Sequence, residues 1–529
     1  MDNLTPIHAF LEHSADHRGD AVALEHGDVV LTYGEIEAGA NRVAARLRDL
    51  GVARGDRVGL LADNGRAYVE GFFGILKADA GCVALNGANK ARTSAALLAD
   101  SGAVGLVTMA ARVARDLPEI VHGAPDLRFV IIDRANPAWA LPAAVRVLGA
   151  EDVASASSAR VASDVGLDDL CAILYTSGST GLPRGATLRH RNLAANTRQI
   201  LAYLHLTADD SVLSVLPFHY SFGTSLLLTH FAVGGRVVVD NRFMYPSTVV
   251  ETLERSRVSS FSGVPSTYAI LAANTDFLRR SWPDLRYVTQ AGGGMTAALT
   301  RRLIDELPLH VRLFVMYGQT EASPRLSYVP PERLREKLGS IGIPIPGVTL
   351  TIRDEHGSEC APGEVGEVVA AGENLMQGYW NDPAETALVL KADGLHTGDL
   401  GRKDGDGYVF LVDRVKNMIK VGANRVSPRE IEDVIAEVAG VAEVCVAGVP
   451  DELLGEAVEA FVVVAPGADV SPERILAHCR EYLALYKVPR GVHFRDVLPR
   501  SAAGKVVRSE LVCIVSSLTP PSYLHGRHR

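Results

Sequence analysis

The sequence predicts an α/β protein in which sheets flanked by helices are followed by a smaller α+β domain. At 529 residues the chain is too long for one compact core and should divide into several lobes. Through about residue 350, short apolar runs of strand length alternate with helical stretches, which is typical of mostly parallel sheets. Beyond a charged segment at residues 412–417, strand-like runs at 441–449, 457–464 and 492–497 accompany a helical stretch at 472–483.

Composition and charge exclude several classes of protein. Hydrophobic residues make up 47% and charged residues 22%, as in ordinary globular proteins, and the net charge is −9. That charge argues against nucleic acid or an anionic membrane as a partner. No apolar run approaches the roughly 20 residues that span a bilayer, and no secretory signal is visible. Six widely spaced cysteines suit neither a zinc site nor a disulfide framework, so we expect a cytoplasmic protein.

The first elements have clear local signals. Thr32 and Glu35 form a capping-box pattern that opens a helix, and Gly51 ends it. Residues 57–61 suit a buried strand. The segment 135–165 is rich in Ala, Pro and Ser, so we expect a surface connection there.

A loop at residues 175–185, YTSGSTGLPRG, follows an apolar run at 171–174 and precedes a helical stretch at 189–204. Glycines let backbone N–H groups face an anion, and hydroxyls add donors, so the loop could cradle phosphate. It lacks the Gly-Lys-Ser/Thr ending of a Walker A loop, and Gly-x-Ser-x-Gly occurs nowhere in the chain. An ordinary polar turn is the alternative. The phosphate contacts expected here are Thr176, Ser177, Gly178, Ser179, Thr180, Gly181 and Arg184.

Two further strand ends carry candidate ligand-binding residues. A strand at 212–216 runs into PFHYSFG at 217–223, where His219 could face a ligand or be a hydrogen-bonded core histidine. A strand at 285–290 precedes a glycine turn at 291–295 and a helix at about 297–307. The turn satisfies a loose dinucleotide-binding pattern, but the next strand, 311–316, ends in Tyr317 and Gly318 without the acidic residue that such sites need.

The second half of the chain adds polar candidates. Asp399, between tight turns in LHTGDL at 395–400, could accept hydrogen bonds from two ribose hydroxyls. Ser427, Pro428 and Glu430 predict the start of a helix with a capping box, and Val426 and Ile431 occupy staple positions. A glycine-containing loop at 499–508 carries a lysine, which could reach a phosphate or be merely exposed.

These segments, with YGQTE at 317–321 and the stretch from 363 to 380, follow one another in the order found in the acyl-adenylate-forming superfamily. The chain resembles that family, and within it the stand-alone bacterial acyl-CoA synthetases. The resemblance implies a large N-terminal domain of layered β-sheets flanked by helices at residues 1–413. A hinge and a small mobile α+β C-terminal lid domain would occupy 414–517, and a disordered tail 518–529.

The resemblance also implies roles for individual residues. Lys505 would bridge the acid and the α-phosphate, Thr320 would contact phosphate, and Glu321 would hold Mg²⁺. His219 would lie beside the acyl carbonyl and the path of the incoming thiol. The remaining nucleotide contacts would be Gly292, Gly293, Gly294, Tyr317, Gly318, Gln319, Asp399, Arg414 and the hinge residue Lys416.

The implied activity is that of an AMP-forming acid–thiol ligase. A carboxylic acid and ATP would give acyl-AMP and pyrophosphate, and the thiol of CoA or of a carrier protein's phosphopantetheine would then accept the acyl group. The cofactors would be ATP and Mg²⁺, an acyl or peptidyl carrier protein is a candidate partner, and the protein would be a monomer or homodimer. One departure is Arg184, where the family usually has lysine.

The nature of the acid is the most open point. Amino-acid activators of the family usually carry an Asp after the aromatic residue of the 217–223 segment, whereas Tyr220 and Ser221 stand here. Because a buried ammonium without a partner is costly, we favour an acid without an α-amine, with a stand-alone amino-acid adenylating enzyme as the alternative. Small residues suggest room for an aliphatic chain, while aromatic ones suit an aryl acid. The expected pocket residues are His219, Tyr220, Gly223, Gly263, Gly294 and Met295.

Overall fold

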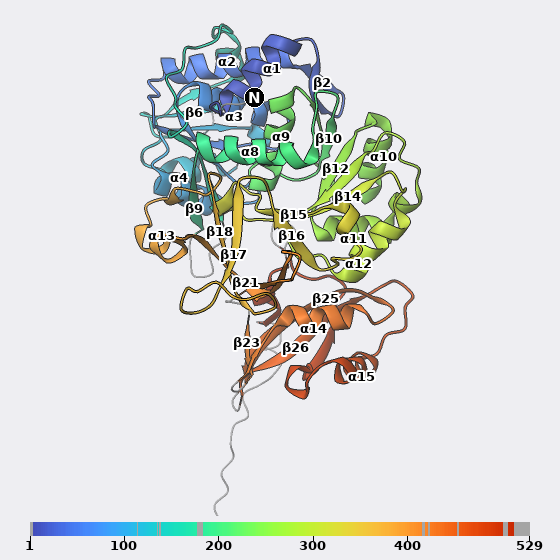
Figure 1. The fold of residues 1–529 in the computed structure, drawn as a ribbon. Coiled ribbons are helices and arrows are strands. Elements are labelled where there is room, and N and C mark those ends of the chain that lie inside the picture. The colour runs from blue at the N-terminus through green and yellow to red at the C-terminus, as the bar shows by residue number, and fades with distance from the viewer. Residues whose placement is uncertain are drawn as a thin grey trace, which may run out of the picture.

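The structure is a computed structural model that describes residues 4–113, 115–134, 136, 139–176, 183–414, 418–421, 424–451, 454–500 and 506–512. Three sheets organise these residues, two before residue 415 and one after residue 418 (Figure 1). The predicted α/β class with a separate, smaller C-terminal domain is confirmed.

The first sheet has eight strands in the order β19-β9-β8-β4-β3-β5-β6-β7. Its bounds are β3 (Arg57–Leu61), β4 (Gly81–Ala84), β5 (Gly105–Thr108), β6 (Phe129–Ile132), β7 (Arg146–Leu148), β8 (Leu170–Thr176), β9 (Arg184–Arg189) and β19 (Gly378–Tyr379). Six strands of this sheet are mutually parallel: β8, β4, β3, β5, β6 and β7. The chain between parallel neighbours must cross over to the other end of the sheet, as the segments between these strands do. The helices before and between them are α1 (His8–Arg18), α2 (Tyr33–Asp49), α3 (Arg66–Lys77), α4 (Ala91–Ser101), α5 (Ala110–Val113), α6 (Leu117–His122) and α7 (Ala150–Ala154).

The second sheet has fourteen strands, with β20 beside β21 and the rest in the order β17-β18-β21-β22-β16-β15-β14-β13-β12-β10-β11-β1-β2. Its first strands are β1 (Val22–His26), β2 (Val29–Thr32), β10 (Ser211–Ser214), β11 (Arg236–Val239), β12 (Ser260–Gly263), β13 (Tyr287–Gln290) and β14 (Arg312–Tyr317). The antiparallel extension contains β15 (Ser327–Val329), β16 (Ser340–Pro344), β17 (Val348–Arg353), β18 (Gly366–Gly372), β20 (Leu390–Lys391), β21 (Gly394–Lys403) and β22 (Val409–Arg414). Strands β10 to β14 and β1 pair in parallel, so the loops that follow them converge at one edge.

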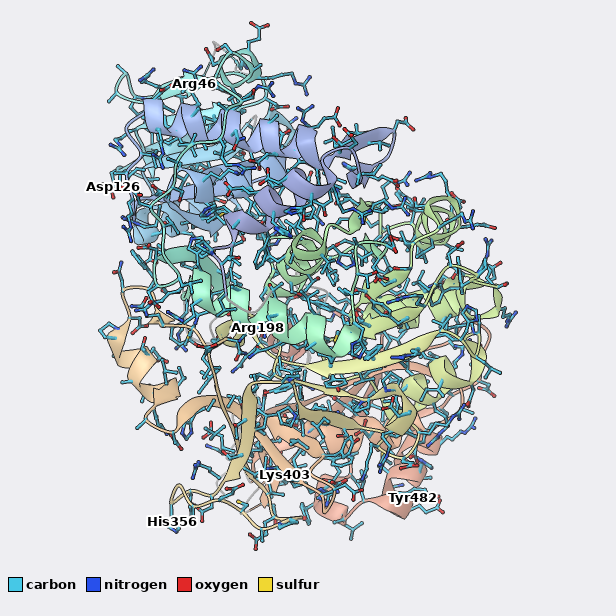
Figure 2. The ribbon with its side chains drawn as sticks, turned by 45° about the horizontal axis from the view of Figure 1, so that its top comes forward. Arg46, Asp126, Arg198, His356, Lys403 and Tyr482 are labelled. Atoms are coloured by element: carbon cyan, nitrogen blue, oxygen red, sulfur yellow. The ribbon has the colours of Figure 1, made fainter. Side chains whose placement is uncertain are left out.

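Helices α8 (His190–Leu204) and α9 (Ser221–Val233) lie between the two sheets (Figure 1). Their apolar residues share one buried cluster with residues of both sheets, which makes these helices the centre of the N-terminal core. Arg198 projects from the exposed side of α8 (Figure 2). The other face of the large sheet is covered by α10 (Pro246–Ser256), α11 (Pro265–Asn274) and α12 (Ala297–Glu306). Shorter elements of this region are α13 (Pro383–Val389) and the 3-10 turns η1 (Phe277–Arg279), η2 (Thr320–Ala322) and η3 (Pro331–Arg333).

The third sheet forms the C-terminal part, in the order β24-β23-β26-β25 with β27 beside β26. Its elements are β23 (Ile419–Val421), β24 (Asn424–Val426), α14 (Pro428–Ala436), β25 (Val441–Asp451), β26 (Gly455–Val464), α15 (Pro472–Tyr482), η4 (Leu485–Lys487) and β27 (Gly491–Phe494). Tyr482 marks the end of α15 (Figure 2). A buried apolar cluster between this sheet and its two helices gives the region its own core.

Local predictions can be compared with these elements. The Thr32 capping box is confirmed, because the backbone N–H of Thr32 donates to Glu35 at 2.8 Å and that of Glu35 to Thr32 at 3.2 Å. Ser427 caps α14 as predicted, accepting from the backbone N–H of Glu430 at 3.3 Å. The capping box there is wrong, since the Glu430 carboxylate instead pairs with Lys487 at 2.6 Å.

The segment between β6 and β8 also differs from expectation. It contains β7 and α7, so part of the predicted surface connection is an edge strand paired in parallel with β6. Short strands at sheet edges carry weak sequence signals because only one neighbour supports them. Among the described residues, no helix is both long and apolar enough to cross a bilayer.

Candidate active site

The loops after β10, β12, β13 and β14 meet at one edge of the large sheet, because these strands are parallel neighbours. This is where open α/β sheets bind ligands. The segment 217–223, the glycine turn at 291–295 and the loop at 317–321 therefore share one edge, as the sequence predicted.

His219 and Tyr220 lie in the turn between β10 and α9. Their ring centroids are 4.3 Å apart, and the Tyr220 hydroxyl accepts a hydrogen bond from Asn86 at 3.0 Å. Nε2 of His219 is buried and has no hydrogen-bond partner among the described residues. Burial, and then the charge of Arg112, lower the pKa of His219 to about 4. The imidazole is therefore neutral at physiological pH, with one nitrogen available to a ligand.

Tyr317 and Asp399 come together from strands far apart in the sequence. Tyr317 ends β14 and Asp399 lies in β21, where its side chain is buried with 4% of the residue exposed. The Tyr317 hydroxyl donates to the Asp399 carboxylate at 2.5 Å. On the neighbouring strand, Arg414 is the cross-strand partner of Asp399. Three of the predicted nucleotide contacts thus occupy one corner of the large sheet.

The turn after Tyr317 is held close to the chain that follows it. A side-chain carbon at Gly318 would lie 1.8 Å from the Pro324 carbonyl oxygen, so only glycine fits there. Gln319 is extended and precedes η2, which starts at Thr320. The Thr320 hydroxyl lies 3.1 Å from that of Ser221, the first residue of α9. Thr320 is therefore fixed against the helix that begins beside His219.

Glu321 has one occupied and one available carboxylate oxygen. Its Oε1 accepts a hydrogen bond from the Tyr379 hydroxyl at 2.9 Å, while Oε2 has no partner among the described residues. Arg184 also contacts Tyr379, with its guanidinium 5.7 Å from the ring centre and in hydrogen-bond contact with the hydroxyl, and it lies 2.9 Å from the Glu385 carboxylate. A partly exposed carboxylate of this kind suits Mg²⁺, which keeps most of its waters and takes one or two protein oxygens. Arg184 is tied to α13 through its ion pair with Glu385.

The glycine turn lies under the first turn of α14. Gly292 has a φ of 85°, a conformation that favours glycine. The Gln290 side chain donates to the Gly293 carbonyl at 2.8 Å and fixes the turn. A carbon added at Gly294 would come within 3.4 Å of the Arg429 guanidinium, so the C-terminal part of the chain covers this turn.

Three expected pocket residues are surrounded differently from what their size suggested. A side-chain carbon at Gly223 would lie 2.1 Å from the Pro217 carbonyl oxygen, so backbone takes the space. At Gly263 it would meet Thr267 at 2.8 Å. Met295, 5% exposed, packs with the cluster under α11 and α12. The expectation that small residues at 223 and 263 leave room for an acyl chain is therefore wrong.

Several predicted residues lie outside the described part of the chain. Thr176 ends β8, and its hydroxyl is 3.4 Å from the Arg184 carbonyl. The rest of the phosphate loop, from Ser177 to Gly181, is outside the described residues, as are Lys416 and Lys505.

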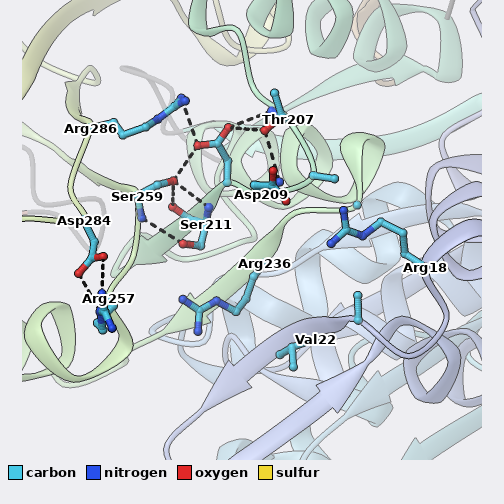
Figure 3. A pocket seen from close by; sticks show the side chains of 14 residues that line it. Arg18, Val22, Thr207, Asp209, Ser211, Arg236, Arg257, Ser259, Asp284 and Arg286 are labelled. Atoms are coloured by element: carbon cyan, nitrogen blue, oxygen red, sulfur yellow. Dashed lines mark hydrogen bonds and ion pairs between the residues drawn. The ribbon is translucent and has the colours of Figure 1, made fainter.

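A separate hollow of about 590 Å³ lies at the opposite edge of the large sheet (Figure 3). Residues that precede β10, β11, β12 and β13 line it, so it faces away from the predicted catalytic loops. Three of the arginines that line it are paired with acids, Arg286 with Asp210 at 3.1 Å, Arg257 with Asp284 at 2.9 Å and Arg236 with Glu25 at 2.6 Å. We therefore assign this hollow no part in acid activation.

Sequence reasoning missed two residues at the site. Tyr379 was noted only as part of the stretch 363–380, although a tyrosine there could have suggested a partner for a carboxylate. Arg325 is 2% exposed, and its guanidinium lies 4.6 Å above the Phe222 ring. Its burial could not be expected, because arginines are mostly exposed.

Comparison with known proteins agrees with this architecture. A family model described as AMP-binding enzyme matches residues 11–380, and one described as AMP-binding enzyme C-terminal domain matches residues 430–505. A feruloyl-CoA synthase from Amycolatopsis sp is 36% identical over 492 residues, covering 93% of this chain and 95% of that protein. A long-chain-fatty-acid–CoA ligase from Yersinia pestis is 34% identical, covering 96% of this chain and 94% of that protein.

Solved structures give the same result. The anthranilate CoA ligase AuaEII in complex with anthranoyl-AMP superposes with a TM-score of 0.89 at 26% identity, covering 98% of this chain and 99% of that chain. ATP-bound MatB from Rhodopseudomonas palustris gives 0.86 at 28% identity, covering 97% and 100%. The chain belongs to the AMP-binding enzyme family, the acyl-adenylate-forming superfamily, and is an AMP-forming ligase that activates a carboxylic acid with ATP.

Proposed function

We propose that this ligase activates an aromatic carboxylic acid without an α-amine and transfers it to CoA. The observation that carries the proposal is the surroundings of the first turn of α9. Tyr220 meets the Asn86 amide, Ser221 meets the Thr320 hydroxyl, and Phe222 lies beneath the Arg325 guanidinium. A substrate ammonium would find a cation there instead of a carboxylate, and like charges at a buried site repel.

The names of the relatives support an aromatic acid. A feruloyl-CoA synthase and an anthranilate CoA ligase both act on aromatic acids, and this chain covers nearly all of each. A long-chain-fatty-acid–CoA ligase is similar to this chain at nearly the same sequence identity, so an aliphatic acid is the second candidate substrate. The aromatic side chains of Tyr220 and Phe222 beside the site favour the first.

In the proposed reaction the acid's carboxylate attacks the α-phosphorus of ATP, and pyrophosphate leaves. Tyr317 and Asp399 orient the nucleoside, and Thr320 lies near the α-phosphate. Glu321 would hold Mg²⁺, which would neutralise phosphate charge when bound. Lys505 would bridge the carboxylate and the phosphate, and the remainder of the loop from Thr176 to Arg184 would contact the departing pyrophosphate.

Thioester formation is the second half of the proposal. The CoA sulfur attacks the acyl carbonyl of acyl-AMP, its thiol proton is released, and AMP leaves. His219 supports this step, because its neutral imidazole and unpartnered Nε2 suit a position beside the acyl carbonyl. We further propose a cytoplasmic setting and a monomer or homodimer.

Pyrophosphate release with a panel of acids tests the function. The panel contains benzoic and cinnamic acids, octanoic and palmitic acids, and phenylalanine and alanine as amino acids. CoA and a phosphopantetheinylated carrier protein are offered in parallel, and mass spectrometry identifies the acyl-AMP and the thioester. We expect aryl-CoA products. Turnover only of amino acids, or none with any acid, contradicts the proposal, and a product on the carrier protein alone would reassign the acceptor.

A further inference from the structure

Arg325 is a buried cation for which the described residues supply no counter-ion. Only 2% of the residue is exposed, and no carboxylate lies within ion-pair distance among the described residues. Its Nε is buried and has no hydrogen-bond partner in the part of the chain that the structure describes. The Tyr203 hydroxyl is its side-chain hydrogen-bond partner, and that hydroxyl donates in turn to the Met316 sulfur at 3.0 Å.

The backbone around Arg325 is firmly held. Its carbonyl accepts from the Asn196 amide at 2.9 Å and from the Asn374 amide at 3.0 Å. Its own N–H donates to Asn196 at 3.2 Å. The position of this side chain is therefore built into the fold rather than left to a mobile loop.

The guanidinium lies beside the first turn of α9, the turn on which the proposed function places the acid. Thr320 and Arg325 are five residues apart, and they contact successive residues of α9, Ser221 and Phe222. The proposed function places Thr320 near the carboxyl group that is activated, and Arg325 contacts the next residue along α9. A substrate that passes along Phe222 would bring its distal end to this cation.

An unpaired buried cation is costly, and the Phe222 ring and the Tyr203 hydroxyl offset only part of that cost. Burial lowers the pKa of Arg325 below its usual range, because the charged form loses its hydration. A ligand oxygen would complete the set of hydrogen bonds. A ligand that supplies no acceptor leaves the buried donors unsatisfied, and it therefore binds less tightly than one that does.

We infer that Arg325 recognises a hydrogen-bond acceptor oxygen at the end of the aromatic acid remote from its reacting carboxyl. This inference rests on the proposed function and narrows it to oxygenated aryl acids. A phenol or a second carboxylate would supply such an oxygen, and an unsubstituted ring would not.

Three acids of one shape test the inference: cinnamic acid, 4-hydroxycinnamic acid and 4-carboxycinnamic acid. With the wild-type protein and CoA, we expect kcat/KM for at least one oxygenated acid to exceed that for cinnamic acid about tenfold or more. Arg325→Met keeps an unbranched, apolar side chain at the buried position and removes its charge and its donors. In this variant the ratio of kcat/KM for the oxygenated acid to kcat/KM for cinnamic acid should fall to about one. The fall should come from a lower kcat/KM for the oxygenated acid, while cinnamic acid is still activated.

Two variants control the comparison. Arg325→Lys keeps the charge and should retain part of the preference. Arg312→Met removes another guanidinium that lies over a ring, 5.5 Å from Phe314, on the exposed side of β14, and should leave the ratio unchanged.

The outcomes separate the inference from the function on which it rests. If the wild-type protein has the same kcat/KM for cinnamic acid as for both oxygenated acids, the inference is overturned. This result needs no variant, so the test remains decisive even if a variant does not fold. An unchanged ratio in folded Arg325→Met also overturns it. Failure to activate any of the acids, while octanoic acid is turned over, refutes instead the aromatic substrate of the proposed function.

Discussion

Replacing Tyr379 with phenylalanine removes one hydroxyl from the proposed magnesium site, together with that hydroxyl's weaker contact with Arg184. That hydroxyl donates to the Glu321 carboxylate at 2.9 Å. The ring below the Arg184 guanidinium remains, so the contact at 5.7 Å is kept. Burial, and then the charge of Glu321, raise the pKa of Tyr379, so the hydroxyl stays protonated and donates across the working pH range.

The expected magnitude follows from this one hydrogen bond. A hydrogen bond to a charged group contributes about 1.5–3 kcal/mol, which corresponds to roughly 10- to 150-fold in an equilibrium or rate. Tyr379 is partly exposed, so water can replace the lost donor and the lower end applies. Residues that orient a metal ligand typically change metal affinity or activity by about 10- to 100-fold. We expect about a tenfold loss of apparent Mg²⁺ affinity.

The assay is pyrophosphate release at saturating acid, with Mg²⁺ varied at several fixed ATP concentrations. Tyr408→Phe is the matched control, because Tyr408 also lies below a cation, with Lys337 4.8 Å from its ring centre, and is away from the site. A Tyr379→Phe protein with wild-type dependence on Mg²⁺ would refute the role given to Glu321. So would an equal loss at every Mg²⁺ concentration.

Three further predictions concern other parts of the site. Asp399→Asn should raise the KM for ATP about tenfold or more, because a charged acceptor is lost, and an unchanged KM in ATP titrations would contradict a ribose contact. Arg184→Lys should lose less than about a hundredfold in kcat/KM, or about 2.7 kcal/mol of transition-state stabilisation, since the charge is kept; a larger loss in the same assay would show that the planar guanidinium is needed. Burial lowers the pKa of His219 and His230 to about 4 and that of His190 to about 3, so the folded state binds fewer protons than the unfolded state. Stability should therefore fall as pH decreases from about 6.5 to 4, by up to about 1.4 kcal/mol per pH unit for each histidine; denaturant unfolding at pH 7, 6 and 5 with a flat profile would contradict this.

Much of the architecture could be predicted from the sequence, because local signals and global order agree. The Thr32 box, the strand at 57–61 and the cap at Ser427 each depend on neighbouring residues alone, and the structure has all three. The expectation that Tyr317 and Asp399 contact one nucleotide rested on motif order, since 82 residues separate them; the hydrogen bond between them was not predicted. The order of family motifs indicates which distant segments come together, whereas hydrophobic periodicity indicates only local secondary structure.

The errors have a common physical cause, which is that residue size and type do not reveal surroundings. Gly223 was expected to widen a pocket, but the space beside it belongs to the Pro217 carbonyl. Glu430 was expected to complete a capping box at the start of α14, but its carboxylate forms an ion pair with Lys487, which lies in a turn distant in sequence. Arg325 gave no sign of burial because its partners, an aromatic ring and a hydroxyl, come from two other helices.

The position of the arginine-lined hollow relative to the catalytic loops has a consequence for how this protein can change. Strands β10 to β13 have four residues each, so about 13 Å of backbone separates their two ends. Effects of substitutions that far apart, without shared partners, usually add. Ion pairs such as Arg286–Asp210 lie at one end of these strands, whereas the loops proposed to bind the acid lie at the other end. Variants selected for a new substrate could therefore be combined with variants selected for heat resistance, with little interference between the two.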